Sequence, residues 1–208
     1  MIQTKRYKIS RVFSIIVAIL IAGIVFFLLD FKVQFSTSIK IPIVIGSSLV
    51  VFILVYRFLM RKYINRKRIV QTEPPVELLE ILNKHVLYYN SLSSDEKKLF
   101  VDKVRIFIAE KRITGIKTDI DDVIKVLVAA SAIIPVFAFP EFEYDHLGEV
   151  LVYPMNFSED FSMSDSENTL GMVIQNSATV ILSKPALLQS FKNPTDGFNV
   201  GIHEFIHK

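Results

Sequence analysis

Hydrophobic residues are concentrated in two long runs near the N-terminus. Residues 12–29 are 18 consecutive uncharged positions, and a second uncharged run covers residues 41–56, reaching Met60 if Arg57 extends its charge to the membrane surface. An 18-residue helix is about 27 Å long, close to the thickness of a bilayer core. The pattern predicts two transmembrane helices, over about 12–31 and 41–60, in a membrane hairpin formed by residues 1–70.

Two other interpretations of these runs are open. Apolar helices also occur in the cores of soluble proteins, and the first run could belong to a cleaved signal peptide. That run is long for a signal peptide, and Asp30-Phe31-Lys32 follows it where a cleavage site would have small residues. The charges that flank both runs disfavour a buried core. We therefore expect two retained transmembrane helices.

The basic residues around the two runs predict an orientation. Four lysines and arginines precede the first run, six end or follow the second, and the connecting loop has only Lys32 and Lys40. Basic flanks stay in the cytoplasm, so the N-terminus and the domain after the hairpin should be cytoplasmic. The basic segment 61–68 should also contact anionic headgroups of the lipid bilayer. Because most of the net charge of +3 comes from these flanks, nucleic-acid binding is not expected.

After the hairpin, the hydrophobic pattern along the chain is first helical and then strand-like. Residues 71–75 contain two prolines and predict a linker before a domain at 76–208. Helical spacing covers 76–89, and Ser93 with Glu96 forms a capping box that opens a second helix. Thr118-Asp119 should cap a third helix, with Asp119, Asp121 and Asp122 in its first turn and a central, buried body at 123–134.

Strand-like segments follow the third helix. Residues 149–153, 172–175 and 179–182 are rich in Val, Ile and Leu, and the last two should form a hairpin around 176–178. Ser183 should cap a short helix, and Asn199 a final one with Val200, Ile202, Phe205 and Ile206 on its core side. Helices followed by a small sheet predict the α+β class.

The final helix carries an HExxH motif at residues 203–207. Positions i and i+4 lie on one helical face, so His203 and His207 can bind a single zinc ion, and Glu204 can act as general base on a zinc-activated water. The chain has no cysteine, which excludes thiolate ligands and disulfides. An amphipathic helix with two solvated histidines is the structural alternative.

Several segments of this domain resemble the Mlc titration factor A family of zinc-dependent peptidases. The resemblance runs from about Leu92 to Lys208 and includes the capped helix at Leu92-Ser93, the apolar helix 120–134, the strand ending in Tyr153-Pro154, and the strand 180–183. The segment 196–208, Asp-Gly-Phe-Asn-Val-Gly-Ile-His-Glu-Phe-Ile-His-Lys, is the most specific part.

The resemblance implies a gluzincin-like domain with zinc as cofactor, His203 and His207 as metal ligands and Glu204 as the catalytic base. The family's third ligand is a Glu well downstream of the second His, so we expect the domain to be C-terminally incomplete at Lys208. Gly201 and Ile206 stand where Val and Ala are more usual, and the membrane hairpin is an addition. The predicted transmembrane hairpin, taken together with the resemblance, implies a location in the bacterial inner membrane. The resemblance itself implies a peptide or protein substrate and a regulatory protein partner.

Other polar residues offer rival sites. His146 and Glu149, in a cluster with Glu141, Glu143 and Asp145, could supply a metal ligand, although a solvated acidic loop is the simpler interpretation. His85 is expected at the surface, and residues 158–166 could border a cleft. The alternative function is a catalytically inactive, membrane-tethered binding module that lacks the third zinc ligand.

Overall fold

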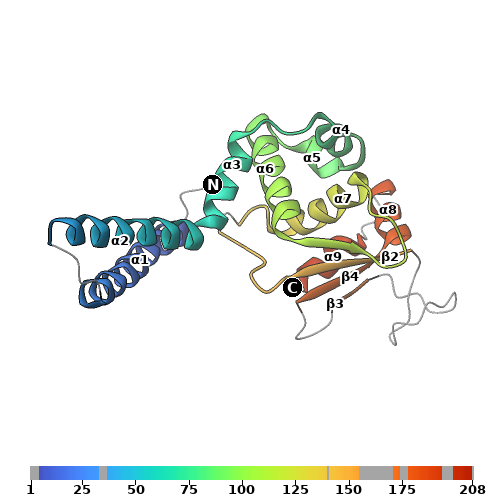
Figure 1. Ribbon diagram of the computed structural model, residues 1–208. Helices are drawn as coiled ribbons and strands as arrows, with labels where there is room; N and C mark the ends of the chain where they lie inside the picture. The colour runs from blue at the N-terminus through green and yellow to red at the C-terminus, as the bar shows by residue number, and fades with distance from the viewer. Residues whose placement is uncertain are drawn as a thin grey trace. The chain divides into compact units, whose positions relative to one another are not determined.

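The computed structural model describes residues 5–32, 37–139, 141–154, 171–173, 178–193 and 199–207. The chain divides into two compact units, Met1–Gln71 and Thr72–Lys208. The described part of the first unit is helical, whereas the second combines helices with a sheet (Figure 1). The α+β class predicted from the sequence is confirmed.

The first unit contains helices α1 (Lys5–Lys32), α2 (Thr37–Leu59) and α3 (Arg61–Gln71). Segments Lys5–Leu29 of α1 and Ile41–Leu59 of α2 are long and apolar enough to cross a membrane, and only 11% and 6% of them is buried. A core helix of a soluble domain would bury most of its apolar surface, as these two do not. Both helices are therefore consistent with membrane association, and their orientation stays a prediction.

The second unit places its helices against one small sheet. Its elements, in chain order, are α4 (Val76–His85), α5 (Leu87–Ser91), α6 (Ser94–Glu110), β1 (Arg112–Gly115), α7 (Asp122–Ile133), η1 (Ile134–Val136), β2 (Glu149–Tyr153), β3 (Gly171–Val173), β4 (Thr179–Ser183), α8 (Lys184–Lys192) and α9 (Val200–Ile206).

The described part of the sheet has the strand order β1-β2-β4-β3. Strands β1, β2 and β4 are parallel, with Ile113 opposite Val150 and Val150 opposite Val180. Strand β3 pairs antiparallel with β4, with Met172 opposite Ile181, which agrees with the predicted hairpin. The turn that joins β3 and β4 lies outside the described residues. Strand β1 was not predicted from the sequence.

Helix α7 is the centre of the core, as the sequence predicted. Every residue from Val126 to Ile133 is buried, and the helix contacts α4, α6, α8 and α9. Phe100, Val104 and Phe107 of α6 are also buried in this core. Because α7 touches so many elements, it is the scaffold against which the last helix is placed.

Three of the four helix starts predicted from capping residues are at the predicted residues. The Ser93 N–H donates to Glu96 at 2.9 Å, which confirms the capping box, and Ser183 accepts from the Ala186 N–H at 3.3 Å. The predicted start of α7 is wrong. Asp121, not Thr118 or Asp119, caps it by accepting from the Ile124 N–H at 2.8 Å. Since a cap bonds two or three residues ahead, Asp119 is too far upstream to satisfy that N–H.

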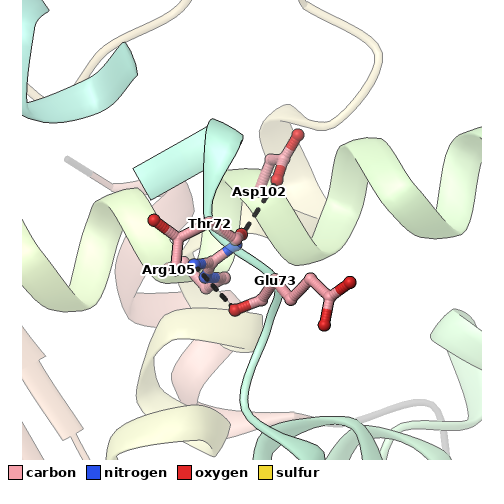
Figure 2. Close-up of polar contacts among 4 residues, drawn as sticks. All are labelled: Thr72, Glu73, Asp102 and Arg105. Carbon is pink, nitrogen blue, oxygen red and sulfur yellow. Dashed lines mark hydrogen bonds and ion pairs between the residues drawn. The ribbon is translucent and has the colours of Figure 1, made fainter. Parts of the chain in front are cut away.

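Arg105 on α6 holds the segment between α3 and α4 (Figure 2). Its guanidinium donates to the carbonyl oxygens of Thr72 at 2.8 Å and Glu73 at 3.4 Å. Asp102, one turn earlier, lies 3.9 Å from the same guanidinium. Both side chains are almost buried, with exposed fractions of 11% for Arg105 and 13% for Asp102. The start of the second unit is thus fixed to α6 by a charged side chain bonded to backbone oxygens.

Burial of Asp102 should make stability depend on pH in mildly acidic solution. Desolvation raises the pKa of Asp102 above its ordinary 3.8, and the Arg105 and Lys98 charges offset part of this. A raised pKa means that the native state binds the proton more tightly. The free energy of unfolding should therefore fall as pH rises from about 4 through the folded pKa.

Two substitutions test this expectation in urea unfolding of the detergent-solubilised chain between pH 4 and 8. Asp102→Asn should flatten the acidic slope, whereas Arg105→Gln should steepen it because the offsetting charge is gone. Arg112→Gln, on an exposed arginine of β1, is the matched control and should leave the slope unchanged. An unchanged slope in Asp102→Asn would show that another group causes the pH dependence.

Candidate metal centre

The HExxH segment forms helix α9, and hydrogen bonds fix where it begins. Asn199 caps the helix as predicted, since its side-chain oxygen accepts from the Ile202 N–H at 3.0 Å. The Val200 N–H donates to the Ser190 hydroxyl oxygen at 3.1 Å, and that hydroxyl donates to the Ala186 carbonyl oxygen at 2.8 Å. Ser190 therefore ties the first turn of α9 to α8. No pattern in the sequence identified this role.

An aromatic cluster anchors the middle of α9. Phe205 is 1% exposed and packs edge-on against Phe107, at 5.8 Å between ring centroids, and against Tyr144 at 5.5 Å. The Tyr144 hydroxyl donates to the Ala132 carbonyl oxygen of α7 at 2.8 Å. Lys111 donates to the carbonyl oxygen of Tyr144 and thereby holds the segment that carries this ring. The cluster joins α9 to α6 and α7.

A glycine allows α9 to lie directly on α7. A Cβ atom added to Gly201 would be 2.2 Å from the Ser131 hydroxyl oxygen and 2.6 Å from the Ser131 Cβ. Real Cβ atoms are essentially never this close to another heavy atom. A larger residue such as Val would not fit here without a shift of one of the two helices. Gly201 therefore sets the distance between the two helices.

His203 and His207 lie together on one exposed face of α9. Their ring centroids are 4.7 Å apart with an interplanar angle of 76°. Both residues are solvent-exposed, and His207 is the C-cap of the helix. The placement of the two imidazoles side by side, predicted from the i, i+4 spacing, is thus present in the structure.

Glu204 lies on the buried side of the same helix and is only 7% exposed. Desolvation raises the pKa of its carboxyl group, and the two neighbouring histidines act in the opposite direction. A carboxylate whose pKa is raised is a stronger base than an ordinary surface Glu, which suits a role in proton transfer.

The core side of α9 differs from the predicted one. Val200 and Phe205 are buried as expected, but Ile206 is 65% exposed and Gly201 and Glu204 take the buried positions. The reason is that Gly201 packs on Ser131, so the buried stripe runs through 200–201 and 204–205. Ile206 is rotated out of this stripe.

The rival candidates form no metal-binding group with the histidine pair among the described residues. Glu149 is on β2 and accepts a hydrogen bond from the Thr114 hydroxyl at 2.5 Å, and His146 lies in the turn before that strand. His85, expected at the surface, is half-buried at the end of α4. Residues 158–166 and Asp196-Gly197 lie outside the described residues. Within the described ranges, no group of three His, Asp or Glu side chains is arranged to hold a metal ion.

The two histidines fit a zinc site in part. Imidazole nitrogens are common zinc ligands, and two on adjacent turns of one helix supply two of the three protein ligands that a catalytic zinc usually has. Their exposure leaves room for a further ligand and for substrate. The described residues do not identify that third ligand.

Comparison with known proteins identifies the family of the chain. Residues 60–208 match the family described as glucose-regulated metallo-peptidase M90. "Uncharacterized protein slr2042" of Synechocystis sp. is 25% identical over 151 residues, which cover 68% of this chain and 55% of that protein. The chain thus spans about half the length of this relative. No solved structure matches the chain. The chain belongs to the glucose-regulated metallo-peptidase M90 family, the family of Mlc titration factor A.

Proposed function

We propose that this chain forms part of a membrane-anchored zinc peptidase in which His203 and His207 hold the metal and Glu204 is the general base. Membership of a metallopeptidase family supports peptide hydrolysis with a metal. The single observation that carries the finer assignment is the arrangement on α9, where two exposed imidazoles, 4.7 Å apart between ring centroids, accompany the buried carboxyl group of Glu204.

Each side chain of this helix has a separate task in the proposed reaction. The zinc ion, when bound, polarises the scissile carbonyl and lowers the pKa of water. Glu204 accepts the proton of the attacking water at its carboxylate and returns it to the leaving amine. Phe205 and Gly201 keep the helix against the core, so that the carboxylate is held at a constant position relative to the imidazoles.

We place the peptide substrate along β3. In the described part of the sheet, β3 is the outer strand beside β4, and it contacts α9. A peptide in extended conformation can add to an outer strand through backbone hydrogen bonds, which bind any sequence. This would bring a scissile bond next to the helix that carries the histidines.

We further propose that α1 and α2 anchor the peptidase in the bacterial inner membrane, with both flanks and the second unit cytoplasmic. The distribution of basic residues supports this orientation. Because the chain has no cysteine, single cysteines introduced at Ser36 and Ser94 would report their sides by labelling with an impermeant maleimide. Labelling of both positions from the same side would overturn the orientation. A regulatory protein partner stays a prediction from the resemblance.

Zinc binding tests the metal assignment most directly. The detergent-solubilised chain should bind one zinc ion, measured by metal analysis and by competition with a chelating dye. His203→Ala and His207→Ala should each weaken binding by at least about 100-fold, because loss of an inner ligand exceeds the 10–100-fold cost of losing an outer partner. His85→Ala and His146→Ala are matched controls and should bind as the unaltered chain does.

The outcome separates the two candidate functions. Zinc binding that does not depend on His203 and His207 would overturn the site. The alternative of an inactive binding module is favoured by the lack of a third ligand among the described residues. That alternative would be established if zinc binds at the predicted histidines but neither this chain nor its longest natural form hydrolyses a labelled protein substrate.

A further inference from the structure

The net positive charge of the chain comes from its first unit. Residues 1–71 contain 12 lysines and arginines and only one acidic residue, Asp30, whereas residues 72–208 contain 12 basic and 20 acidic residues. Nine of the basic residues lie in two short segments, 5–11 and 61–68, which contain no Asp or Glu. A modest net charge of +3 therefore conceals a strongly basic first unit.

Aromatic and hydroxyl contacts bring these two segments together. The rings of Tyr7 and Tyr63 meet edge-on at 5.3 Å between centroids. The Ser10 hydroxyl lies 3.1 Å from the Tyr63 hydroxyl, at hydrogen-bond distance. The first turns of α1 therefore lie against α3, although 53 positions separate Ser10 from Tyr63. Sequence alone placed the segments on the same side of a membrane but did not predict this contact.

The joined segments form a solvent-exposed basic surface at one end of the apolar helices. Eight of the nine cations are exposed, and Arg66 is half-buried. The exposed apolar residues of α1 begin at Ile9 and Val12, within the same turns, and those of α2 extend to Phe58. The cations and the tyrosine pair thus occupy the level at which an inserted hairpin would meet lipid headgroups.

We propose that the segments 5–11 and 61–68 form one binding surface for anionic phospholipid headgroups. Lysines and arginines gathered beside a membrane span bind anionic lipid, and arginine pairs with phosphate oxygens through two parallel hydrogen bonds. The hydroxyl groups of Ser10 and Tyr63 lie within this surface and offer neutral partners to the same phosphate. Nucleic acid also binds basic surfaces, but here the apolar surface continues directly from the cations, which favours lipid.

This inference rests on the membrane anchoring in the proposed function and is independent of the zinc site. A single Asn65→Cys substitution, at an exposed position of α3, allows a polarity-sensitive dye to be attached to the full chain. The labelled chain, in neutral detergent, is titrated with phosphatidylglycerol or phosphatidylcholine. A saturable response to phosphatidylglycerol, and a much smaller one to phosphatidylcholine, is the expected result.

Removing cations from the basic segment 61–68 tests whether these residues bind the lipid. Replacing Arg66, Lys67 and Arg68 together by Gln should weaken the response to phosphatidylglycerol by about 100-fold, since each cation near an anionic bilayer contributes roughly a fivefold gain in binding. The matched control replaces three exposed basic residues of the second unit, Lys84, Arg112 and Lys192, by Gln and should change binding less than twofold. Arg66→Lys with Arg68→Lys keeps the charge and should retain the preference even if an arginine contact within the fold is lost.

Three outcomes would overturn the proposal. One is an equal response to the two lipids, and another is an unchanged affinity in the triple Gln variant. The third is a response to a short DNA duplex at 0.15 M salt that exceeds the response to phosphatidylglycerol. Zinc binding to the same preparations is measured in parallel. If the expected lipid response is absent while zinc binding still depends on His203 and His207, only the lipid proposal is overturned.

Discussion

Replacing Gly201 by Ala should displace the HExxH helix from the core. The new Cβ would be 2.6 Å from the Ser131 Cβ and 3.2 Å from a Leu187 methyl carbon. Ser131 belongs to the buried helix α7, so its Cβ cannot move without the backbone of that helix. Overpacking of this kind costs about 1–3 kcal/mol, and we expect the free energy of unfolding to fall by at least about 1 kcal/mol. Zinc affinity should fall with it, because His203 is two residues away.

A second substitution separates this clash from a general effect of alanine. Ser131→Gly removes the two atoms closest to the new Cβ and leaves the Leu187 methyl carbon, so Gly201→Ala combined with Ser131→Gly should recover part of the lost stability and zinc affinity. Ser131→Ala retains its own Cβ and should not rescue. The control is Gly148→Ala, whose Cβ would be 3.4 Å from its nearest neighbour, an ordinary contact. Stability changes that simply add in the double variant would show that the two residues do not interact.

Local side-chain chemistry explains which parts of the fold could be predicted. Ser93 with Glu96, Ser183 and Asn199 satisfy backbone N–H groups a few residues ahead, so their sequence context is enough to mark a helix start. Strand β2 was likewise visible in the Val, Leu and Tyr of 149–153, of which Val150 and Val152 are buried.

The unpredicted parts depend on partners far away in the chain. Strand β1 is only Arg-Ile-Thr-Gly, and it is ordered by pairing with β2, 37 positions later. Four residues of mixed character have no periodicity of their own, so no local pattern could reveal the strand. The parallel order of β1, β2 and β4 is equally a property of the packed domain.

The candidate site shows the same division. The spacing of His203 and His207 follows from helix geometry and could be predicted from the motif alone. Burial of Glu204 and exposure of Ile206 could not, because they depend on the close contact between Gly201 and Ser131, which are 70 positions apart. Serine in a helix as apolar as α7 gave no sign that a glycine of the last helix would lie on it.

Replacing Glu204 by Gln should abolish turnover and leave zinc bound. The amide has almost the same shape as the carboxyl group but cannot accept the proton of the attacking water, and loss of general base catalysis reduces rates by about 10²–10⁴-fold. The measurement is hydrolysis of a labelled protein substrate by the longest natural form of the chain, with bound zinc determined on the same sample. Glu149→Gln, which removes a carboxylate from β2, is the matched control and should retain both properties.

The stability of the Glu204→Gln variant decides whether its loss of turnover can be attributed to the missing general base. Glu204 is buried, and desolvation disfavours its charged form and raises its pKa, so a neutral amide should cost less to bury than a carboxylate. The Gln variant should unfold at no lower urea concentration than the unaltered chain, and a lost rate could not then be attributed to unfolding. Full activity in this variant would remove Glu204 from the reaction. Loss of zinc would instead make it a residue that positions the two histidines.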